Sequence, residues 1–296
     1  MPTTPETDEP NATSLRLALP KGRMQEGVKT LLADAGIRIH IGIRDYRPVL
    51  SIPGFETKSL KPQNIVEMLH HGSRDLGFAG ADWVREHEAD LVELLDTRLD
   101  PVQLVAAAPA ALLEDGKLPK RRLRLASEYP TLARTWIEEQ GIDAELVRTY
   151  GATEAFPPED ADCIVDNTAT GATLRANQLE IVDVLMESST RLYACPSSLE
   201  DPAKKAAIDR FVLLIRSVLE ARTRVMIEVN VNEAELEGLV GILPCMREAT
   251  VSQLHGTGAY AVKAAVPRDS LPTLIPELKA RGGTDVIVSA LAQIVP

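Results

Sequence analysis

The chain has 296 residues, of which 45% are apolar and 25% charged, and its formal net charge is −11. This is the composition of a globular protein long enough for two or three domains. Nucleic-acid binding needs a dense basic surface, so the acidic balance excludes that class, although local cations and helix N-termini can still bind small anions. No apolar run approaches the roughly 20 residues of a membrane-spanning helix, and we expect no membrane association.

The first 14 residues are polar, acidic and rich in Pro and Thr. They predict a disordered tail rather than a signal peptide. The cysteines Cys163, Cys195 and Cys245 are far apart in the sequence and odd in number. They predict free thiols in a reducing compartment, so we expect the protein to be cytoplasmic.

The first predicted elements alternate between strand and helix. Residues 15–19 predict a strand, and an amphipathic stretch over 25–35 predicts a helix that stops at Gly36. A second helix is predicted over 62–71, with a proline at its first position. The short apolar segment 75–80 predicts the strand that follows it.

The same order of elements then recurs. A strand is predicted over 123–127, a helix over 132–140 and a strand over 162–166. Leu-Arg-Leu-Ala opens both halves, and in each half a strand ends in a loop of small residues that enters a helix. Coincidence of common α/β elements is one explanation. The other is two similar α/β lobes around a cleft, where ligands favour the carboxyl ends of strands.

Two similar apolar segments, 104–109 and 191–196, end in proline on either side of the second half. We interpret them as strands that cross between the lobes, so that the first lobe takes back the helix after Asp201, the expected N-cap. The predicted division is lobe I, residues 15–107 with 192–221, and lobe II, residues 108–191.

Residues 222–296 predict a separate small domain. Strands are expected over 225–231, 250–254, 260–266 and 285–290, and helices over 233–243 and 270–280. The resulting order βαββαβ is ferredoxin-like and ACT-like. Such a unit is common as a small-ligand sensing module.

The strongest chemical signal is Asp-Asn-Thr-Ala-Thr-Gly-Ala-Thr-Leu over residues 166–174. An acid ends the strand, small residues follow, and Leu174 is expected to open a helix. Backbone N–H groups at a helix start have no partner within the helix, and the helix dipole favours an anion there. Gly171 permits close backbone approach, and the threonine hydroxyls add donors for phosphate oxygens. We expect an anion-binding loop, with Asp166 placed for the hydroxyls of a ribose.

This loop resembles the phosphoribosyl-diphosphate (PRPP) loop of the ATP phosphoribosyltransferase family. The matching residues are Asp166, Thr170, Gly171, Thr173 and Leu174, whereas Asn167 and Thr168 are polar where Leu-Val is common. The resemblance extends to Gly151 and Glu154, to the Lys-Gly-Arg of residues 19–24, to Lys61, and to the segment 75–84. It covers about residues 15–295 and includes the C-terminal domain of the long form.

The resemblance implies that adenine N1 of ATP displaces diphosphate from C1 of PRPP, the first step of histidine biosynthesis. The implied PRPP contacts are Asp166, Thr168, Ala169, Thr170, Gly171, Ala172 and Thr173. The implied ATP contacts are Lys21, Arg23, Lys61, Gly80 and Asp82. The implied catalytic residues are Asp166, Glu154, Lys21 and Arg23. Mg²⁺ is expected to be carried mainly by the substrate phosphates. Histidine is expected to inhibit through the C-terminal domain, and the chain to form a homo-oligomer, a dimer or hexamer.

Each of these assignments has a plainer alternative. The loop is also compatible with a threonine-capped helix start. Lys21 and Arg23 are also compatible with ordinary exposed cations, Asp82 with a helix cap, and Glu154 with a solvated loop acid. For the whole chain, the alternatives are a non-catalytic two-lobe small-molecule receptor and a nucleotide-binding regulatory protein that uses only the C-terminal domain.

Overall fold

The structure is a computed structural model that describes residues 14–295 except 41, 43–45 and 257. The predicted tail over 1–14 lies outside the described residues apart from Ser14. The chain divides into two compact units, Met1–Ala33 with Ile37–Arg210, and Asp34–Gly36 with Phe211–Pro296. No helix among the described residues is long and apolar enough to cross a membrane.

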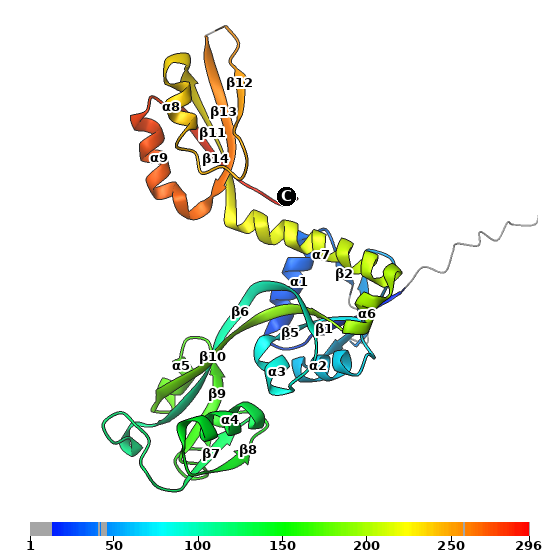
Figure 1. Ribbon diagram of the computed structural model, residues 1–296, viewed down its shortest axis with the longest axis vertical. Coiled ribbons are helices and arrows are strands. Elements are labelled where there is room, and N and C mark those ends of the chain that lie inside the picture. Colours follow the sequence, from blue (N-terminus) through cyan, green and yellow to red (C-terminus); the bar gives the residue numbers. More distant parts are fainter. Residues whose placement is uncertain (1–13, 41, 43–45, 257, 296) are drawn as a thin grey trace, which may run out of the picture. The chain divides into compact units, whose positions relative to one another are not determined.

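The first unit contains an eight-stranded sheet (Figure 1). In sheet order its strands are β4 (Phe55–Leu60), β1 (Leu15–Pro20), β5 (Leu76–Gly80), β10 (Leu179–Ala194), β6 (Val92–Pro109), β9 (Cys163–Thr168), β7 (Leu123–Ser127) and β8 (Ala144–Arg148). A separate two-stranded sheet joins β2 (Ile39–His40) and β3 (Val49–Leu50).

The sheet repeats one arrangement. β1 lies between β4 and β5, which run parallel to it, and β7 lies between β8 and β9 in the same way. β10 is antiparallel to β5, β6 is antiparallel to β9, and the two long strands pair with each other. We call β4, β1 and β5 with their helices the first lobe, and β9, β7 and β8 with theirs the second. The predicted two-lobe fold, the internal repeat and the crossing strands are confirmed.

The crossing strands are much longer than the predicted segments 104–109 and 191–196. β6 has 18 residues and β10 has 16, and their pairing contains several register shifts. Arg98 and Asp100 have positive φ angles. These irregularities, with charges and Pro101 among them, break the alternation by which a strand is recognised in sequence.

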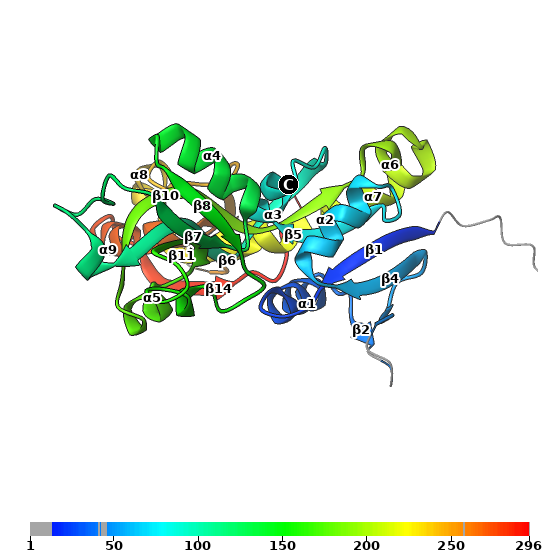
Figure 2. The same ribbon diagram turned by 90° about the horizontal axis from the view of Figure 1, so that it is seen from below.

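The helices of this unit are α1 (Met24–Asp34), α2 (Pro62–His70), α3 (Ala81–Glu86), α4 (Pro130–Gln140), α5 (Ala172–Ala176), α6 (Pro196–Glu200) and the start of α7 (Pro202–Thr223), with the 3-10 turns η1 (Ala110–Leu112) and η2 (Thr153–Ala155). α4 lies over β7 and β8 (Figure 2). The predicted N-cap is confirmed, because Asp201 accepts the N–H groups of Ala203 and Lys204 at the start of α7.

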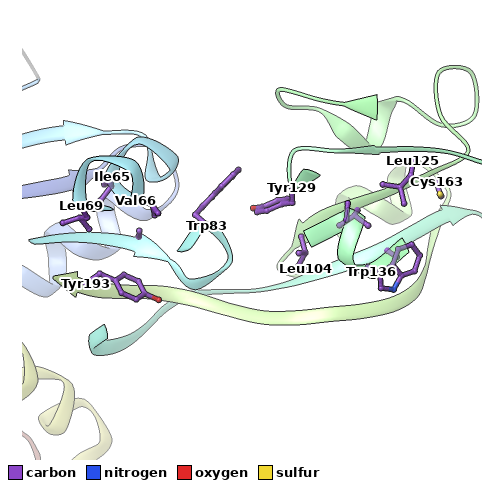
Figure 3. Close-up of a cluster of buried hydrophobic side chains, with 14 of the residues drawn as sticks. Ile65, Val66, Leu69, Trp83, Leu104, Leu125, Tyr129, Trp136, Cys163 and Tyr193 are labelled. Atoms are coloured by element: carbon purple, nitrogen blue, oxygen red, sulfur yellow. The ribbon is translucent and has the colours of Figure 1, made fainter. Parts of the chain in front are cut away.

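A continuous core runs through both lobes (Figure 3). α2 contributes Ile65, Val66 and Leu69 to it, and the second lobe contributes Leu125 and other buried residues. The side chains of Ile65, Val66, Leu69 and Leu125 are fully buried. Apolar burial of this extent stabilises each lobe and the joint between them.

The second unit contains a four-stranded antiparallel sheet in the order β12 (Thr250–Gln253), β13 (Ala259–Pro267), β11 (Arg224–Asn232) and β14 (Thr284–Ala290). Its helical segments are η3 (Glu233–Glu235), α8 (Leu236–Val240), η4 (Arg268–Ser270) and α9 (Leu271–Ala280). The predicted βαββαβ order is confirmed. The predicted helix over 233–243 is wrong in its extent, since a 3-10 turn precedes it and α8 ends before Gly241.

The boundary between the two units falls within α7, which is one continuous helix. The predicted lobe and domain limits at 107/108, 191/192 and 221/222 stay predictions.

Candidate functional site

The predicted phosphate loop leaves the sheet at the carboxyl end of β9. The strand ends at Thr168, residues 169–171 form the turn, and α5 begins at Ala172 rather than at the predicted Leu174. Gly171 has a φ of 69°, a left-handed conformation that glycine adopts readily. Because α5 has only five residues, its dipole is small, and anion binding depends on the donors of the loop itself.

Threonine hydroxyls fix the shape of the turn. Thr168 Oγ1 accepts the N–H of Gly171 at 3.0 Å, and Thr170 Oγ1 accepts that of Ala172 at 3.4 Å. These two bonds agree with the alternative of a threonine-capped helix start. A hydroxyl that accepts one hydrogen bond can still donate another, however. The Thr173 side chain is exposed, and its hydroxyl forms no hydrogen bond within the described part of the chain. The loop therefore keeps several O–H donors for an anion.

Asp166 is a mostly buried acid beside two other acids. Its Oδ1 accepts the N–H of Asn167 at 2.7 Å, and Thr153 donates a side-chain hydrogen bond. Burial raises the pKa of Asp166 to about 6, the carboxylates of Glu128 and Glu154 add to the rise, and the two hydrogen bonds oppose it. A carboxylate in these surroundings gains from a ligand that donates hydrogen bonds or carries positive charge.

Asp82 follows β5 in the first lobe, is only 2% exposed, and has both oxygens occupied. Tyr129 donates its phenolic O–H to Oδ2, and Ser188 donates to Oδ1, each at 2.7 Å. Gly80 is required here, because a Cβ at that position would collide with the Asp82 carboxylate. The Asp82 carboxylate therefore contacts the second lobe and the crossing strand β10 rather than capping α3.

Helix α3 joins the two lobes through further contacts. Trp83 stacks on Tyr129, with ring centroids 4.4 Å apart and an interplanar angle of 25° (Figure 3). Glu86, also buried, accepts the backbone N–H groups of Thr131 and Leu132 at 3.0 Å each. These amides belong to the first turn of α4, where N–H groups lack a partner within the helix. A carboxylate of one lobe thus caps a helix of the other.

Two of the predicted cations lie near residues at the strand ends of the second lobe. Arg23 donates from Nη1 to Oδ1 of Asn167 at 3.4 Å, so it reaches a residue of the loop. Burial raises the pKa of Glu128, and the positive charge of Lys61 opposes that rise. The fold therefore brings cations of the first lobe to the strand ends of the second.

Lys21 is placed differently. Its Nζ lies 3.9 Å from the centroid of the Tyr46 ring, a cation–π contact. Its backbone N–H donates to the carbonyl of Leu60 at 2.9 Å. The side chain is held on an exposed aromatic residue of its own lobe.

A cavity of about 600 Å³ adjoins the loop. Its lining includes Ala169 of the turn and Ser188, the partner of Asp82, and the remainder comes from β6 and β10. Arg98 and Arg191 give it positive charge beside acidic residues. Space of this size next to strand carboxyl ends is where α/β folds bind small ligands.

Several residues of the site were missed in the sequence: Glu86, Glu128, Tyr129 and Ser188. A signal existed for two of them, because Glu128 and Tyr129 directly follow β7, the strand that opens with the repeated Leu-Arg-Leu-Ala. No local pattern marks Ser188 or Glu86, whose partners are 106 and 45 residues away.

These observations define a two-lobed α/β protein of the periplasmic-binding type that carries a threonine-rich turn after β9 and a small ferredoxin-like domain. The family model described as ATP phosphoribosyltransferase matches residues 61–217, and that described as HisG, C-terminal domain matches 221–293. The first match covers more than half of the chain. The chain therefore belongs to the ATP phosphoribosyltransferase family, in the long form with the HisG C-terminal domain.

Individual relatives agree with this assignment. The ATP phosphoribosyltransferase of Pelotomaculum thermopropionicum is 34% identical over 287 residues, which are 95% of this chain and 99% of the relative. That of Desulforudis audaxviator is 34% identical over 291 residues, with the same coverage. The ATP phosphoribosyl transferase (HisG:HisZ) complex from Thermotoga maritima contains a chain with 28% identity and a TM-score of 0.63, matched over 70% of this chain and 98% of that one.

The predicted family, fold class and enzyme class are confirmed. The chain is a phosphoribosyltransferase of the first step of histidine biosynthesis, with a regulatory C-terminal domain, and the receptor alternative is not supported. The individual site residues stay predictions.

Proposed function

We propose that the chain binds PRPP on the loop 166–173 and transfers its phosphoribosyl group to N1 of ATP, releasing diphosphate. The observation that carries this proposal is the pairing of exposed threonine donors with the partly buried acid Asp166 near the end of one strand. An anion site beside a hydrogen-bond acceptor matches a sugar phosphate, which presents both a phosphate and hydroxyl donors.

In this proposal Thr168, Ala169, Thr170, Gly171, Ala172 and Thr173 hold the 5-phosphate. The turn is fixed before the ligand arrives, because Thr168 and Thr170 already bond loop amides. A preformed turn loses little conformational freedom on binding.

Asp166 and Glu154 take the ribose hydroxyls. Negative charge at this point also suits the reaction, because the sugar becomes oxocarbenium-like as diphosphate leaves. Adenine N1 already carries a lone pair, so the reaction needs no general base. The protein acts by positioning and electrostatics.

Lys21, Arg23, Lys61, Gly80 and Asp82 form the ATP side of the proposal. Arg23 and Lys21 meet the diphosphate or triphosphate, while Asp82 acts by holding Tyr129 rather than by touching ATP. This role follows from its burial and its two hydroxyl partners.

Mg²⁺ is part of the proposal as an ion that arrives on the substrate phosphates. No group of three or more His, Cys, Asp or Glu among the described residues is arranged to hold a metal ion. The carboxylates of Glu128, Glu154 and Asp166 are hard oxygen donors, which suit an ion that keeps most ligands from phosphate and water. When bound, Mg²⁺ neutralises charge on the diphosphate.

Histidine acts on the C-terminal domain as a differential binder that favours a less active state. The chain works as a homo-oligomer, a dimer or hexamer, and in the cytoplasm, where the thiols of Cys163, Cys195 and Cys245 stay free. Deleting the residues after Arg222 should leave transfer activity and abolish inhibition by histidine. A folded truncated protein that histidine still inhibits would refute the regulatory part.

The central test is diphosphate release with ATP, PRPP and Mg²⁺. We expect release only when both substrates are present. Release with PRPP alone, or binding of both without turnover, would contradict the proposed transfer.

A further inference from the structure

A chain of hydrogen bonds runs from a buried acid of the first lobe to the phosphate loop and returns to the first lobe. Asp82 accepts the phenolic O–H of Tyr129 at 2.7 Å, and Asn167 donates from Nδ2 to the same phenolic oxygen at 2.8 Å. Oδ1 of Asn167 then accepts from Arg23 Nη1 at 3.4 Å. Four side chains are thereby connected.

The chemistry of the groups fixes the direction of every bond. Ser188 donates to Oδ1 of Asp82, and Tyr129 donates its phenolic O–H to Oδ2. The phenolic oxygen of Tyr129 can therefore only accept its second hydrogen bond. Burial, with the charge of Asp82 and the hydrogen bond to it, raises the pKa of Tyr129 far above its ordinary value, so this proton stays on the phenol. The amide of Asn167 must therefore present Nδ2 to Tyr129 and Oδ1 outward. Its outward oxygen is the end that a guanidinium, which only donates, can use.

We infer that Asn167 is a positioning residue, which orients Arg23 for the departing diphosphate by way of Tyr129 and Asp82. The inference rests on the proposed function and deepens it. Arginine is a long side chain that loses much of its rotamer freedom when it is fixed in one position. Holding Arg23 near the loop before PRPP binds reduces that loss during the reaction.

A leucine at position 167 would have no group to bond either Tyr129 or Arg23. Asn167 therefore connects the loop proposed to hold the sugar phosphate with Arg23, the cation proposed to receive the diphosphate.

A double-mutant cycle on the full chain tests the inference. We expect Asn167→Leu to lower kcat about three- to tenfold, the effect of losing one ordinary hydrogen bond, because the contact is long and exposed. The KM for PRPP should change less than about twofold, because the contact strengthens as charge develops on diphosphate. Arg23→Gln should cost more. The double variant should be no slower than Arg23→Gln alone, because Asn167 acts only through Arg23.

Tyr129→Phe is the second variant. It keeps the ring on Trp83 but removes the hydroxyl that orients the amide, so with Arg23→Gln it should show the same lack of additivity. Asn177→Leu is the matched control, since its amide donates to the carbonyl of Thr173 at 3.0 Å and has no bond to Arg23. Its effect should multiply with that of Arg23→Gln. Thermal unfolding of each variant shows that it is folded.

Multiplicative effects for Asn167→Leu and Arg23→Gln, or an Arg23→Gln variant as fast as wild type, overturn the inference while the transferase proposal stands. A wild-type protein that releases no diphosphate from ATP and PRPP overturns the proposed function itself. The two failures are thus distinguishable.

Discussion

The two lobes of the first unit build the same ion pair at the amino ends of equivalent strands. In the first lobe, Asp75 accepts the N–H of Arg16 at 2.8 Å, and its own N–H donates to the carbonyl of Arg16 at 2.8 Å. In the second, Asp162 accepts the N–H of Arg124 at 2.7 Å and donates to its carbonyl at 2.8 Å. The internal repeat therefore extends to individual hydrogen bonds.

The surroundings of the two acids differ. The Asp75 side chain is fully buried, and Ser198 and Lys204 each add a hydrogen bond of 2.9 Å to it. The Asp162 side chain is 17% exposed, and its one additional ion pair among the described residues is with the exposed Arg121. Burial by itself raises the pKa of Asp75, but the hydrogen bonds outweigh it and hold that pKa well below its usual range. The covering helices α6 and α7 thus turn a repeated surface pair into a core element.

The carboxyl ends of the sheet show a second contrast. Asp82 in the first lobe has hydroxyl partners on both oxygens, whereas Asp166 in the second is surrounded by acids and has a raised pKa. The two equivalent acids therefore differ in their surroundings. The carboxylate of Asp82 is used in internal hydrogen bonds, whereas Asp166 is the acid that we propose binds the ribose.

The largest expected effect is that of Asp75→Asn. It leaves the charges of Arg16 and Lys204 without their buried partner, which costs about 3 to 5 kcal/mol. We expect the urea midpoint of the full chain to fall accordingly. Because the folded pKa of Asp75 is depressed, the wild type should lose the same stabilisation as the pH falls below about 4. A variant as stable as wild type at neutral pH would mean that the burial of Asp75 does not make its ion pair more important than that of Asp162.

Asp166→Asn should have the opposite sign. A folded pKa of about 6, raised above the ordinary value, means that stability is lost as the pH rises from about 4 through 6. The neutral variant avoids this loss, so at pH 8 we expect its free energy of unfolding to exceed that of wild type by about 3 kcal/mol. The gain should vanish near pH 4. PRPP turnover should nevertheless fall, and a variant with full activity would exclude Asp166 from ribose binding.

Thr173→Val tests the loop that only the second lobe carries. Its hydroxyl is exposed and lacks a protein partner among the described residues, so the substitution should leave stability nearly unchanged. Losing one hydrogen bond to a charged phosphate costs about 1.5 kcal/mol. The dissociation constant for PRPP, measured by calorimetry, should rise about tenfold. Unchanged affinity would remove this hydroxyl from the site.

The smallest expected effect is that of Asp162→Asn. An ion pair at the surface contributes about 1 kcal/mol or less, so the urea midpoint should move only slightly. Measured beside Asp75→Asn, it gives the contribution of burial to one repeated motif. Equal losses in the two variants would mean that the covering helices α6 and α7 add nothing.

The sequence by itself determined the elements whose signals are local. Caps, glycine stops and apolar periodicity lie within contiguous residues, and they predicted α1, α2, α4 and the four strands of the C-terminal domain nearly to their bounds. The turn between β9 and α5 belongs to this class too, because its acid, its small residues and its threonines follow one another in the chain. Its role as a phosphate loop stays a prediction.

Only the tertiary structure decided which groups meet across the lobes. The edge strands β4 and β8 have weak apolar patterns, and they are strands because they pair with β1 and β7. The partners Asp82 and Tyr129 are 47 residues apart, and Arg23 and Asn167 are 144 apart. Such contacts depend on how the sheet folds back on itself, and no stretch of neighbouring residues encodes them.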